Sequence, residues 1–216
     1  EATIPNTKGC VLAANITEPA NWRAANHLDS WLVSNGLSAV TGIDTRQVTR
    51  RIRSKGAING VIAYSNRNSI DVSRAITVGK NLRSLEGLDL AKQVTCGQSY
   101  YWSKSTWTNK QGHINSKAEN YLVVAMDFGA KQSILRCLKS AGCKVLVVPA
   151  DTPAKEILGH HPDGIFLSNG PGDPEATGTY TVPTILKLID SGIPIFGICL
   201  GHQMLALALG ARTKKM

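Results

Sequence analysis

From residue 121 onward, short runs of apolar, strand-forming residues alternate with segments that have the periodicity of helices. Apolar runs of this length without polar alternation are typical of strands that are buried on both faces. Strands separated by helices pair in parallel through right-handed crossovers. The pattern predicts a mostly parallel, doubly wound α/β sheet, with strands at residues 121–126, 144–148, 164–167 and 193–198 and helices at residues 131–140, 153–158, 180–190 and 201–209.

The first hundred residues mix short apolar runs with turns and lack this regular alternation. We expect a mixed α/β arrangement there, with strands near residues 9–14, 37–41 and 60–63 and helices near residues 21–35 and 45–56. The polar stretch that follows resembles a linker that Tyr101, Trp102 and Trp107 pin to a surface. The predicted organisation is a partial N-terminal domain in residues 1–100, a linker in 101–119 and a partial doubly wound domain in 120–216.

The composition is that of an ordinary globular protein, with 43% hydrophobic and 18% charged residues. The longest apolar stretches are far shorter than the roughly 20 residues that a membrane helix needs, so no membrane partner is expected. The N-terminal residues lack a secretory signal pattern, which makes the cytoplasm the expected location. Five cysteines without a CxxC pair support neither a disulfide framework nor a zinc site, and no metal site is expected.

The net charge of +9 is compatible with nucleic acid or an acidic protein as a partner. The strongest basic cluster lies in residues 45–56, where Val48 and Ile52 are four residues apart and Gly56 ends the expected helix. We interpret this cluster as the solvated face of an amphipathic helix. The alternative of phosphate binding would gain from aromatic residues between the cations, and the stretch has none, so no nucleic-acid partner is expected.

The loop after the last predicted strand has the form glycine-x-nucleophile-x-glycine, with Gly197, Cys199 and Gly201. A nucleophile in a tight turn between strand and helix has a strained backbone, and its neighbours two residues away must be small for the two elements to pass closely. The positive end of the helix favours the reactive thiolate, and the N–H of Leu200 is free to face an oxyanion. The alternative is a buried cysteine between two packing glycines. We expect Cys199 to be a catalytic nucleophile.

The loop after the third predicted strand, residues 168–174, has Gly170 and Gly172 on either side of Pro171. These residues make a rigid turn with exposed N–H groups, which suits a second oxyanion donor and the polar backbone of a substrate. The alternative is a tight loop with no role in binding. A dinucleotide fingerprint is not supported, because the third glycine of GxGxxG is absent and no helix begins immediately. Both loops follow strands of the parallel sheet, at the edge where such sheets form their sites.

No histidine is well placed in the sequence to serve as a base for Cys199. His202 lies three residues into the helix that begins at the nucleophile, and we expect its ring to pack structurally. His160 and His161 precede a proline at a helix exit, where capping or solvent exposure is the expected role. Asp127 follows the strand at residues 121–126 and is expected to hydrogen-bond within the loop layer.

Residues 197–203, Gly-Ile-Cys-Leu-Gly-His-Gln, and residues 168–174, Ser-Asn-Gly-Pro-Gly-Asp-Pro, together resemble the class I, triad-type glutamine amidotransferases. The resemblance extends to the small, glutaminase subunits of carbamoyl phosphate synthetases through the segments 42–46, 88–92, 126–131 and 208–214. It covers almost the whole chain, including the first region, which other amidotransferases lack. It implies that residues 120–216 form the N-terminal part of an amidotransferase domain.

The resemblance also implies a reaction and the residues that perform it. Cys199 would attack the side-chain amide of glutamine, with the N–H groups of Leu200 and Gly170 as oxyanion donors. Gly170, Gly172, Leu200 and Gln203 would bind the substrate. The ammonia would pass to a large subunit that makes carbamoyl phosphate for arginine and pyrimidine synthesis. ATP and metal would bind only to that large subunit, so the small subunit would need no cofactor.

Two departures from the family pattern shape this expectation. In the family, the base histidine and its orienting glutamate lie well C-terminal to the nucleophile, and no histidine in this chain matches that base. The family's opening segment, which supplies a serine to the glutamine site, is not matched before Glu1. The chain is therefore expected to be a fragment that lacks both ends, with very poor turnover by itself.

Two other functions stay open at the level of sequence. A catalytically incomplete chain could act only as a binding or regulatory piece for the large subunit. A glutaminase for anthranilate or guanylate synthesis is disfavoured, because those enzymes have no counterpart to residues 37–92.

Overall fold

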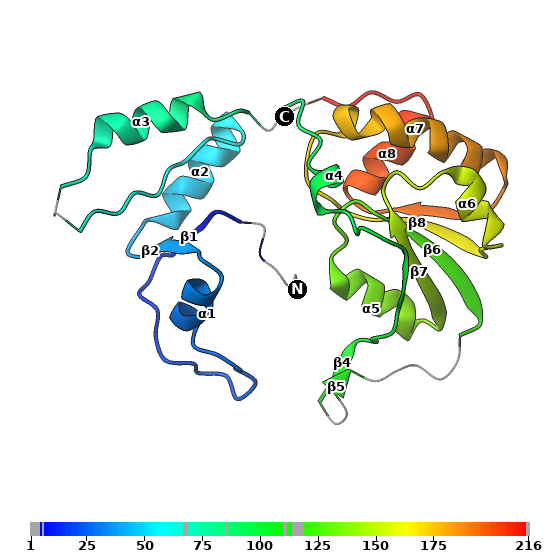
Figure 1. Cartoon of the computed structure of the whole chain (residues 1–216), viewed down its shortest axis with the longest axis horizontal. Helices are drawn as coiled ribbons and strands as arrows, with labels where there is room; N and C mark the ends of the chain where they lie inside the picture. The colour runs from blue at the N-terminus through cyan, green and yellow to red at the C-terminus, as the bar shows by residue number, and fades with distance from the viewer. Residues whose placement is uncertain are drawn as a thin grey trace. The chain divides into compact units, whose positions relative to one another are not determined.

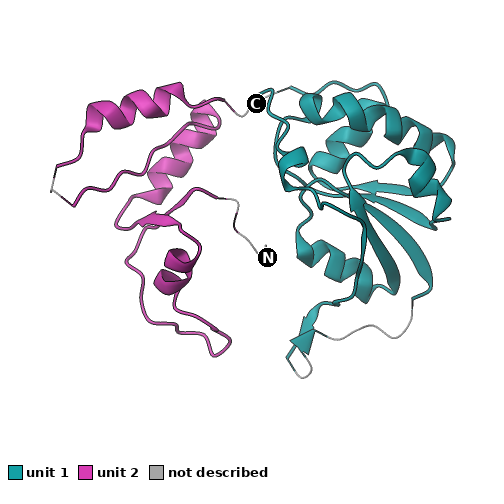
Figure 2. Cartoon of the chain, in the orientation of Figure 1, with its two compact units in different colours: residues 1–2, 85–215 teal, residues 3–84, 216 magenta. Residues whose placement is uncertain are grey.

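The computed structural model describes residues 5, 7–66, 69–84, 86–109, 112–113 and 119–214 of the chain. The chain divides into two compact units (Figure 2). The larger unit comprises residues 1–2 and 85–215, and the smaller unit comprises residues 3–84 and 216.

The larger unit is built on one five-stranded sheet with the order β3-β7-β6-β8-β9. Four strands run parallel, namely β6 (Tyr121–Asp127), β7 (Cys143–Pro149), β8 (Gly164–Leu167) and β9 (Ile195–Gly197). The fifth, β3 (Tyr100–Trp102), pairs antiparallel with β7 at one edge. The predicted α/β class and the mostly parallel sheet are confirmed, and each predicted strand of residues 121–198 matches a strand within a few residues.

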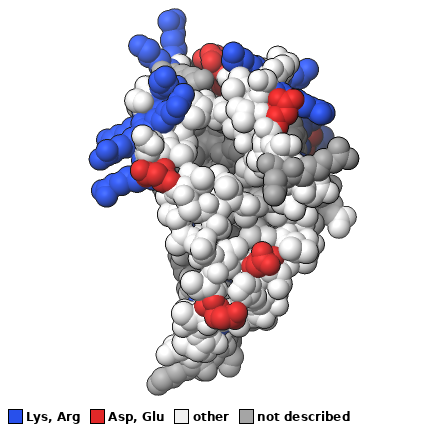
Figure 3. All heavy atoms as spheres, turned by 90° about the vertical axis from the view of Figure 1, so that its left-hand side faces the viewer, with Lys and Arg blue, Asp and Glu red and all other residues white. Residues whose placement is uncertain are grey.

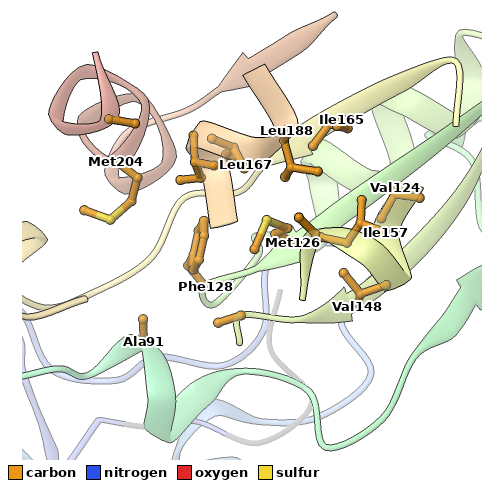
Figure 4. Packing of buried hydrophobic residues seen from close by; sticks show 14 of the residues in the cluster. Ala91, Val124, Met126, Phe128, Val148, Ile157, Ile165, Leu167, Leu188 and Met204 are labelled. Carbon is orange, nitrogen blue, oxygen red and sulfur yellow. The ribbon is translucent and has the colours of Figure 1, made fainter. Parts of the chain in front are cut away.

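Helices cover both faces of this sheet (Figure 1). Along β6, Val124 and Met126 pack in a core with residues of α6 (Ala154–Gly159), α7 (Pro174–Asp190) and α8 (Leu200–Ala208). Ala125 points to the other face, where it joins Leu135 of α5 (Gln132–Ser140) in a second core. Successive strand residues alternate between faces, and both faces are buried, which explains the continuous apolar runs in the sequence. Figure 4 shows the first core, with Met126 and Leu167 at its centre.

Helix α7 begins earlier than the helix predicted at residues 180–190. Asp173 is its N-cap and accepts a hydrogen bond from the N–H of Glu175 at 3.0 Å, and Pro174 occupies the first turn. This is a favourable start for a helix. The next residues include poor helix formers, but Thr177 and Gly178 are buried, so tertiary packing holds this turn in the helix.

Among its described residues, the smaller unit contains a short parallel pair of strands and three helices. Strand β1 (Gly9–Val11) pairs with β2 (Ser38–Val40), and the helices are α1 (Leu28–Ser34), α2 (Thr45–Lys55) and α3 (Val72–Asn81). Helix α3 was not anticipated from the sequence. The strand predicted at residues 60–63 is wrong, since that segment forms no strand. Its Val61 and Ile62 instead line an open apolar groove of about 800 Å³ between α2 and α3.

Residues 86–109 belong to the larger unit, although the sequence places part of them in the first domain and part in a linker. Strand β3 joins the sheet, and Trp102 packs against the core under α5. The segment also contains α4 (Ala91–Val94) and β4 (Trp107–Thr108), which pairs with β5 (Gly112–His113). The change of unit therefore falls near residue 85 rather than at residue 100, because the aromatic residues enter the sheet. Residues 110–111 and 114–118 of the expected linker lie outside the described residues.

Within the described residues, none of the helices combines the length and the hydropathy that are needed to span a membrane.

Candidate active site

Cys199 occupies a sharp turn between β9 and α8. Its backbone has φ 52° and ψ −111°, a conformation that is strained for a residue with a side chain. The residue is the N-cap of α8, and its thiol is free and exposed. The predicted nucleophile elbow is therefore present, with the sulfur accessible rather than sealed in the core.

The two glycines of the elbow allow backbone segments to approach too closely for a side chain. A Cβ atom on Gly201 would lie 2.1 Å from the carbonyl oxygen of Leu167, and one on Gly197 would lie 2.6 Å from the carbonyl carbon and oxygen of Gly201. The N–H of Gly201 donates to the carbonyl of Ser168 at 3.0 Å. The spacing of the motif thus joins the elbow to the end of β8, as the sequence argument requires.

The loop at residues 168–174 lies directly beside the elbow. A Cβ atom on Gly170 would lie 2.9 Å from Cδ2 of Leu200 and 2.1 Å from the carbonyl oxygen of Phe128. In the part of the chain that the structure describes, the N–H groups of Leu200 and Gly170 donate to no acceptor. The structure therefore brings together two residues whose amides are available to bind an anion, which is what the predicted oxyanion role demands.

Buried polar side chains tie this loop to the turn after β6. Ser168 is fully buried, and its Oγ accepts from the N–H of Phe128 at 2.9 Å and donates to the carbonyl of Asn169 at 2.8 Å. The side chain of Asn169 accepts from the N–H of Lys131 at 2.9 Å and donates to the carbonyl of Gly129 at 3.1 Å. These bonds fix the loop relative to the sheet.

Residues 87–96, which we term the bracing segment, pack against the same loop. The N–H of Gly87 donates to Oδ2 of Asp173 at 2.7 Å, and the N–H of Asp173 donates to the carbonyl of Leu88 at 3.0 Å. Gly172 has φ +103°, and a Cβ atom there would lie 2.8 Å from the backbone nitrogen of Leu90. No pattern in the sequence marks residues 87–96 as a support for this loop, although residues 88–92 are among those that carry the resemblance.

Asp89 joins the bracing segment to helix α7. Its Oδ1 accepts hydrogen bonds from Oγ1 of Thr177 at 3.1 Å and from the hydroxyl of Tyr180 at 3.5 Å. Burial and the neighbouring Asp89 charge raise the pKa of Tyr180, so its hydroxyl stays a proton donor. The ammonium of Lys92 lies 5.9 Å from the centre of the same ring.

Asp127 hydrogen-bonds within the loop layer, as predicted. Its carboxylate accepts from the N–H groups of Gly129 at 2.9 Å and Ala130 at 2.7 Å, and from that of Cys96 at 2.8 Å. Burial, together with the Asp127 charge, raises the pKa of the Cys96 thiol to about 11. Burial also raises the pKa of the Cys143 thiol. Neither thiol is suited to be a nucleophile near neutral pH. Both residues are partly buried, whereas Cys199 is exposed.

The predicted packing role of His202 is wrong, because its side chain is exposed on α8. The helix buries Gly201, Met204 and Ala208, which leaves position 202 facing outward. Gln203 is also exposed there, and its N–H donates to the carbonyl of Cys199 at 3.0 Å.

His160 and His161 are exposed at the C-terminal end of α6, where His160 is the C-cap, in agreement with the prediction. Over the described residues, no hydrogen bond joins a histidine to Cys199, and no group of three or more His, Cys, Asp or Glu side chains could hold a metal ion. The arrangement is thus an accessible thiol beside two available amides. A thiol and two amide donors are the groups that nucleophilic attack on a carbonyl and stabilisation of the resulting oxyanion require.

Two family models match this chain. Residues 124–216 match the family model "Glutamine amidotransferase class-I", and residues 1–62 match "Carbamoyl-phosphate synthase small chain, CPSase domain". A solved chain from Thermoplasma acidophilum, described as part of a GMP synthase, is 30% identical with a TM-score of 0.36, over 44% of this chain and 48% of that chain.

Curated relatives extend the match over nearly the whole chain. The carbamoyl phosphate synthase small chains of Brucella ovis, Brucella canis and Brucella suis are each 55% identical over 208 residues, which is 96% of this chain and 51% of each relative. The chain thus spans about half the length of the curated relatives that it matches. With both family models matched in the expected order, the chain belongs to the carbamoyl phosphate synthase small-chain family.

Proposed function

We propose that this chain carries the glutamine-hydrolysing nucleophile of a carbamoyl phosphate synthase, and that it serves as the glutaminase part of that enzyme. The observation that carries the proposal is the exposed Cys199, strained at φ 52° at the start of α8 and flanked by glycines that admit no side chain. The match to the class-I amidotransferase model over residues 124–216 supports the same assignment.

In the proposed reaction, Sγ of Cys199 attacks the side-chain amide carbon of glutamine. The N–H groups of Leu200 and Gly170 stabilise the oxyanion, which is supported by the proximity of these two residues and by the absence of other acceptors for these amides within the described chain. As the C–N bond breaks, the amide nitrogen takes up the proton that the thiol has lost and leaves as ammonia, and a thioester remains. Water then hydrolyses the thioester to glutamate and regenerates the thiol.

We assign the positioning of glutamine to Gly170, Gly172, Leu200 and Gln203. Gly170 and Gly172 let their loop pack closely against Phe128, Leu200 and Leu90, which fixes the direction of its backbone polar groups before a ligand binds. Gln203 is exposed one turn after the nucleophile, where its amide can donate and accept hydrogen bonds with a polar substrate.

The proposed partner is the large subunit of carbamoyl phosphate synthase, which would use the ammonia to make carbamoyl phosphate for arginine and pyrimidine synthesis. Glutamine hydrolysis by a thiol needs only glutamine and water, so we assign no cofactor to this chain and place ATP and metal on the large subunit. We place the reaction in the cytoplasm. The proposal includes neither nucleic acid nor a membrane as a partner.

By itself, the chain is proposed to turn over glutamine very poorly. Nucleophilic thiols in such sites depend on an adjacent base, and no histidine of the described chain is hydrogen-bonded to Cys199. The alternative is that the chain acts only as a binding or regulatory piece. The two functions differ in whether Cys199 reacts with glutamine analogues.

Active-site labelling tests the proposal. A glutamine-mimicking chloroketone should alkylate Cys199 ahead of the other four cysteines, and added glutamine should protect it. Cys137 is the matched control, because it is also free and exposed but lies outside the two loops. Equal labelling of Cys137 and Cys199, without protection by glutamine, would favour the non-enzymatic alternative.

A further inference from the structure

Helix α2 has a row of arginines along one side. Arg46, Arg50 and Arg53 are spaced by four and three residues, so they lie on one face of the helix together with Thr49. These side chains and Thr45 line a surface hollow of about 440 Å³. We call Arg46, Arg50 and Arg53 the arginine stripe.

The opposite side of α2 is apolar and borders the groove of the smaller unit. Val48 lines the apolar groove of the smaller unit, and Ile52 follows it one turn later. Both residues remain partly exposed, at 38% and 43%, and α2 buries none of its residues. None of the three arginines of the stripe lines the apolar groove, and all three are exposed.

The arginine stripe makes no ion pair with any described residue. Like charges at these spacings destabilise a helix by about 0.2–0.5 kcal/mol per pair. The surrounding unit does not offset this charge, because residues 3–84 contain eleven Lys and Arg against four Asp and Glu. Figure 3 shows basic side chains gathered at the upper end of the face that it presents, with few acidic side chains among them.

An acidic protein surface fits this stripe better than nucleic acid does. The three guanidinium groups extend over about 10 Å of helix, and each can bind a carboxylate through two hydrogen bonds. Residues 45–55 contain no aromatic side chain on which bases could stack. Charge complementarity therefore calls for a partner with clustered Asp and Glu side chains.

We propose that the arginine stripe of α2 is a docking surface for an acidic face of the large carbamoyl phosphate synthase subunit. The identity of this partner rests on the proposed function, whereas the need for an acidic partner rests on the stripe alone. Contacts of this kind raise the association rate and weaken with salt, because exposed charges are screened.

The test uses the full-length protein and the large subunit of the same organism. Replacing Arg46, Arg50 and Arg53 by Glu should weaken binding of the large subunit by about tenfold or more at low salt, with a smaller loss at high salt. The dissociation constant is measured by titration at both salt concentrations. Binding as tight as that of the parent protein, or no binding by the parent protein itself, would overturn the docking proposal.

A second variant separates binding from folding. Replacing the three arginines by Gln removes the like-charge repulsion and keeps good helix formers. This variant should be at least as resistant to heat as the parent protein and should still bind the large subunit several-fold more weakly. Unchanged binding by this variant would also overturn the proposal.

The charge-matched control reverses three exposed cations outside α2, namely Arg74, Lys155 and Lys187. Its binding should stay within about twofold of the parent protein. An equal loss in this control would mean that net charge alone acts, which contradicts a specific stripe. Loss of binding to a short DNA duplex, with large-subunit binding unchanged, would assign the stripe to nucleic acid instead.

The labelling and binding experiments together distinguish the glutaminase proposal from the docking proposal. If Cys199 of the parent protein is not labelled by the chloroketone but the stripe variants lose large-subunit binding, the glutaminase proposal fails and the docking proposal stands. If labelling succeeds and binding is insensitive to the stripe, only the docking proposal fails.

Discussion

At the scale of single residues, the site depends on positions where even one carbon atom cannot be added. Gly201 and Gly170 each have a carbonyl oxygen 2.1 Å from the place of a Cβ atom. Cys199, in contrast, has a side chain although its φ of 52° lies in the left-handed region that favours glycine. The strain is maintained because the neighbouring backbone is locked by close packing and by the hydrogen bond from Gly201 to Ser168.

Replacing Gly201 by Ala should therefore lower the free energy of unfolding of the larger unit by about 2–4 kcal/mol. The added methyl group meets the backbone of Leu167, which cannot move without disturbing the sheet. Denaturant titration measures the loss. Gly159→Ala is the control, since a Cβ atom there meets nothing within 4 Å, and it should be neutral or slightly stabilising. Equal stability of both variants would contradict the close approach.

Raised pKa values give the larger unit a defined response to alkaline pH. Burial and Asp127 raise the pKa of Cys96 from 9.0 to about 11 and that of Tyr100 from 10.0 to about 12. In this range the unfolded chain loses these protons first, so stability should fall as the pH rises from about 9 to about 12. The thermal midpoint, measured across this range, should fall less steeply in a variant with Cys96→Ser and Tyr100→Phe. The same slope in both proteins would contradict the assignment.

The sequence predicted the elbow residues, because their types and spacing follow from local sterics. It did not predict that His202 would be exposed, since that depends on which face of α8 the sheet covers. It also missed Asp89 and its partners Thr177 and Tyr180, which lie 88 and 91 residues away. No local pattern marks a contact of that separation. The roles of Gly170, Gly172, Leu200 and Gln203 stay predictions.

At the scale of elements, the bracing segment holds the loop that carries Gly170 and Gly172. Asp173 connects the bracing segment to α7, because it caps α7, accepts from the N–H of Gly87 and donates to the carbonyl of Leu88. A loop held in this way keeps its backbone N–H groups in one arrangement, and in the proposed reaction this lowers the entropy lost when the oxyanion binds.

Asp173→Ala should cost about 1–2 kcal/mol of stability through the lost cap and should raise the KM for glutamine in the full enzyme, because the loop loosens. Asp173→Ser is the informative companion. Its hydroxyl can restore the cap but is too short to serve Gly87 as well, so stability should recover while the KM stays raised. Steady-state kinetics and thermal unfolding measure the two effects. An unchanged KM in both variants would show that the brace has no role in binding.

Most elements of the larger unit could be predicted because continuous apolar runs mark strands buried on both faces. Strand β3 could not be predicted, because its antiparallel partner β7 lies more than forty residues later in the chain. Without that partner in view, residues 100–102 have the pattern of an aromatic linker. The early start of α7 was missed because Thr177 and Gly178 lower helix propensity, and only their burial compensates.

At the scale of the whole molecule, the two units differ in how much apolar surface they bury. The larger unit has two continuous cores on the faces of its sheet. Over the described residues of the smaller unit, Leu32 is the only buried side chain, and many large hydrophobic residues there are exposed. The sequence could not predict this difference, because both regions contain apolar runs and burial depends on what covers them.

Hydrogen exchange of the chain should report this contrast. Amides of β1 and β2 should exchange at least about a hundredfold faster than those of β6 and β7, because few buried contacts oppose local opening in the smaller unit. Peptide-resolved mass spectrometry measures both sets in one sample. Comparable protection of the two sets would contradict the described difference in core.

The most direct test of the central claim replaces Cys199 by Ser in the full enzyme, with the large subunit present. Carbamoyl phosphate synthesis is then measured with glutamine and, separately, with ammonium as the nitrogen source. The account predicts loss of glutamine-dependent synthesis by about a thousandfold or more, with ammonia-dependent synthesis unchanged. Retained glutamine-dependent synthesis, or an equal loss with both nitrogen sources, would contradict the assignment of Cys199 as the nucleophile.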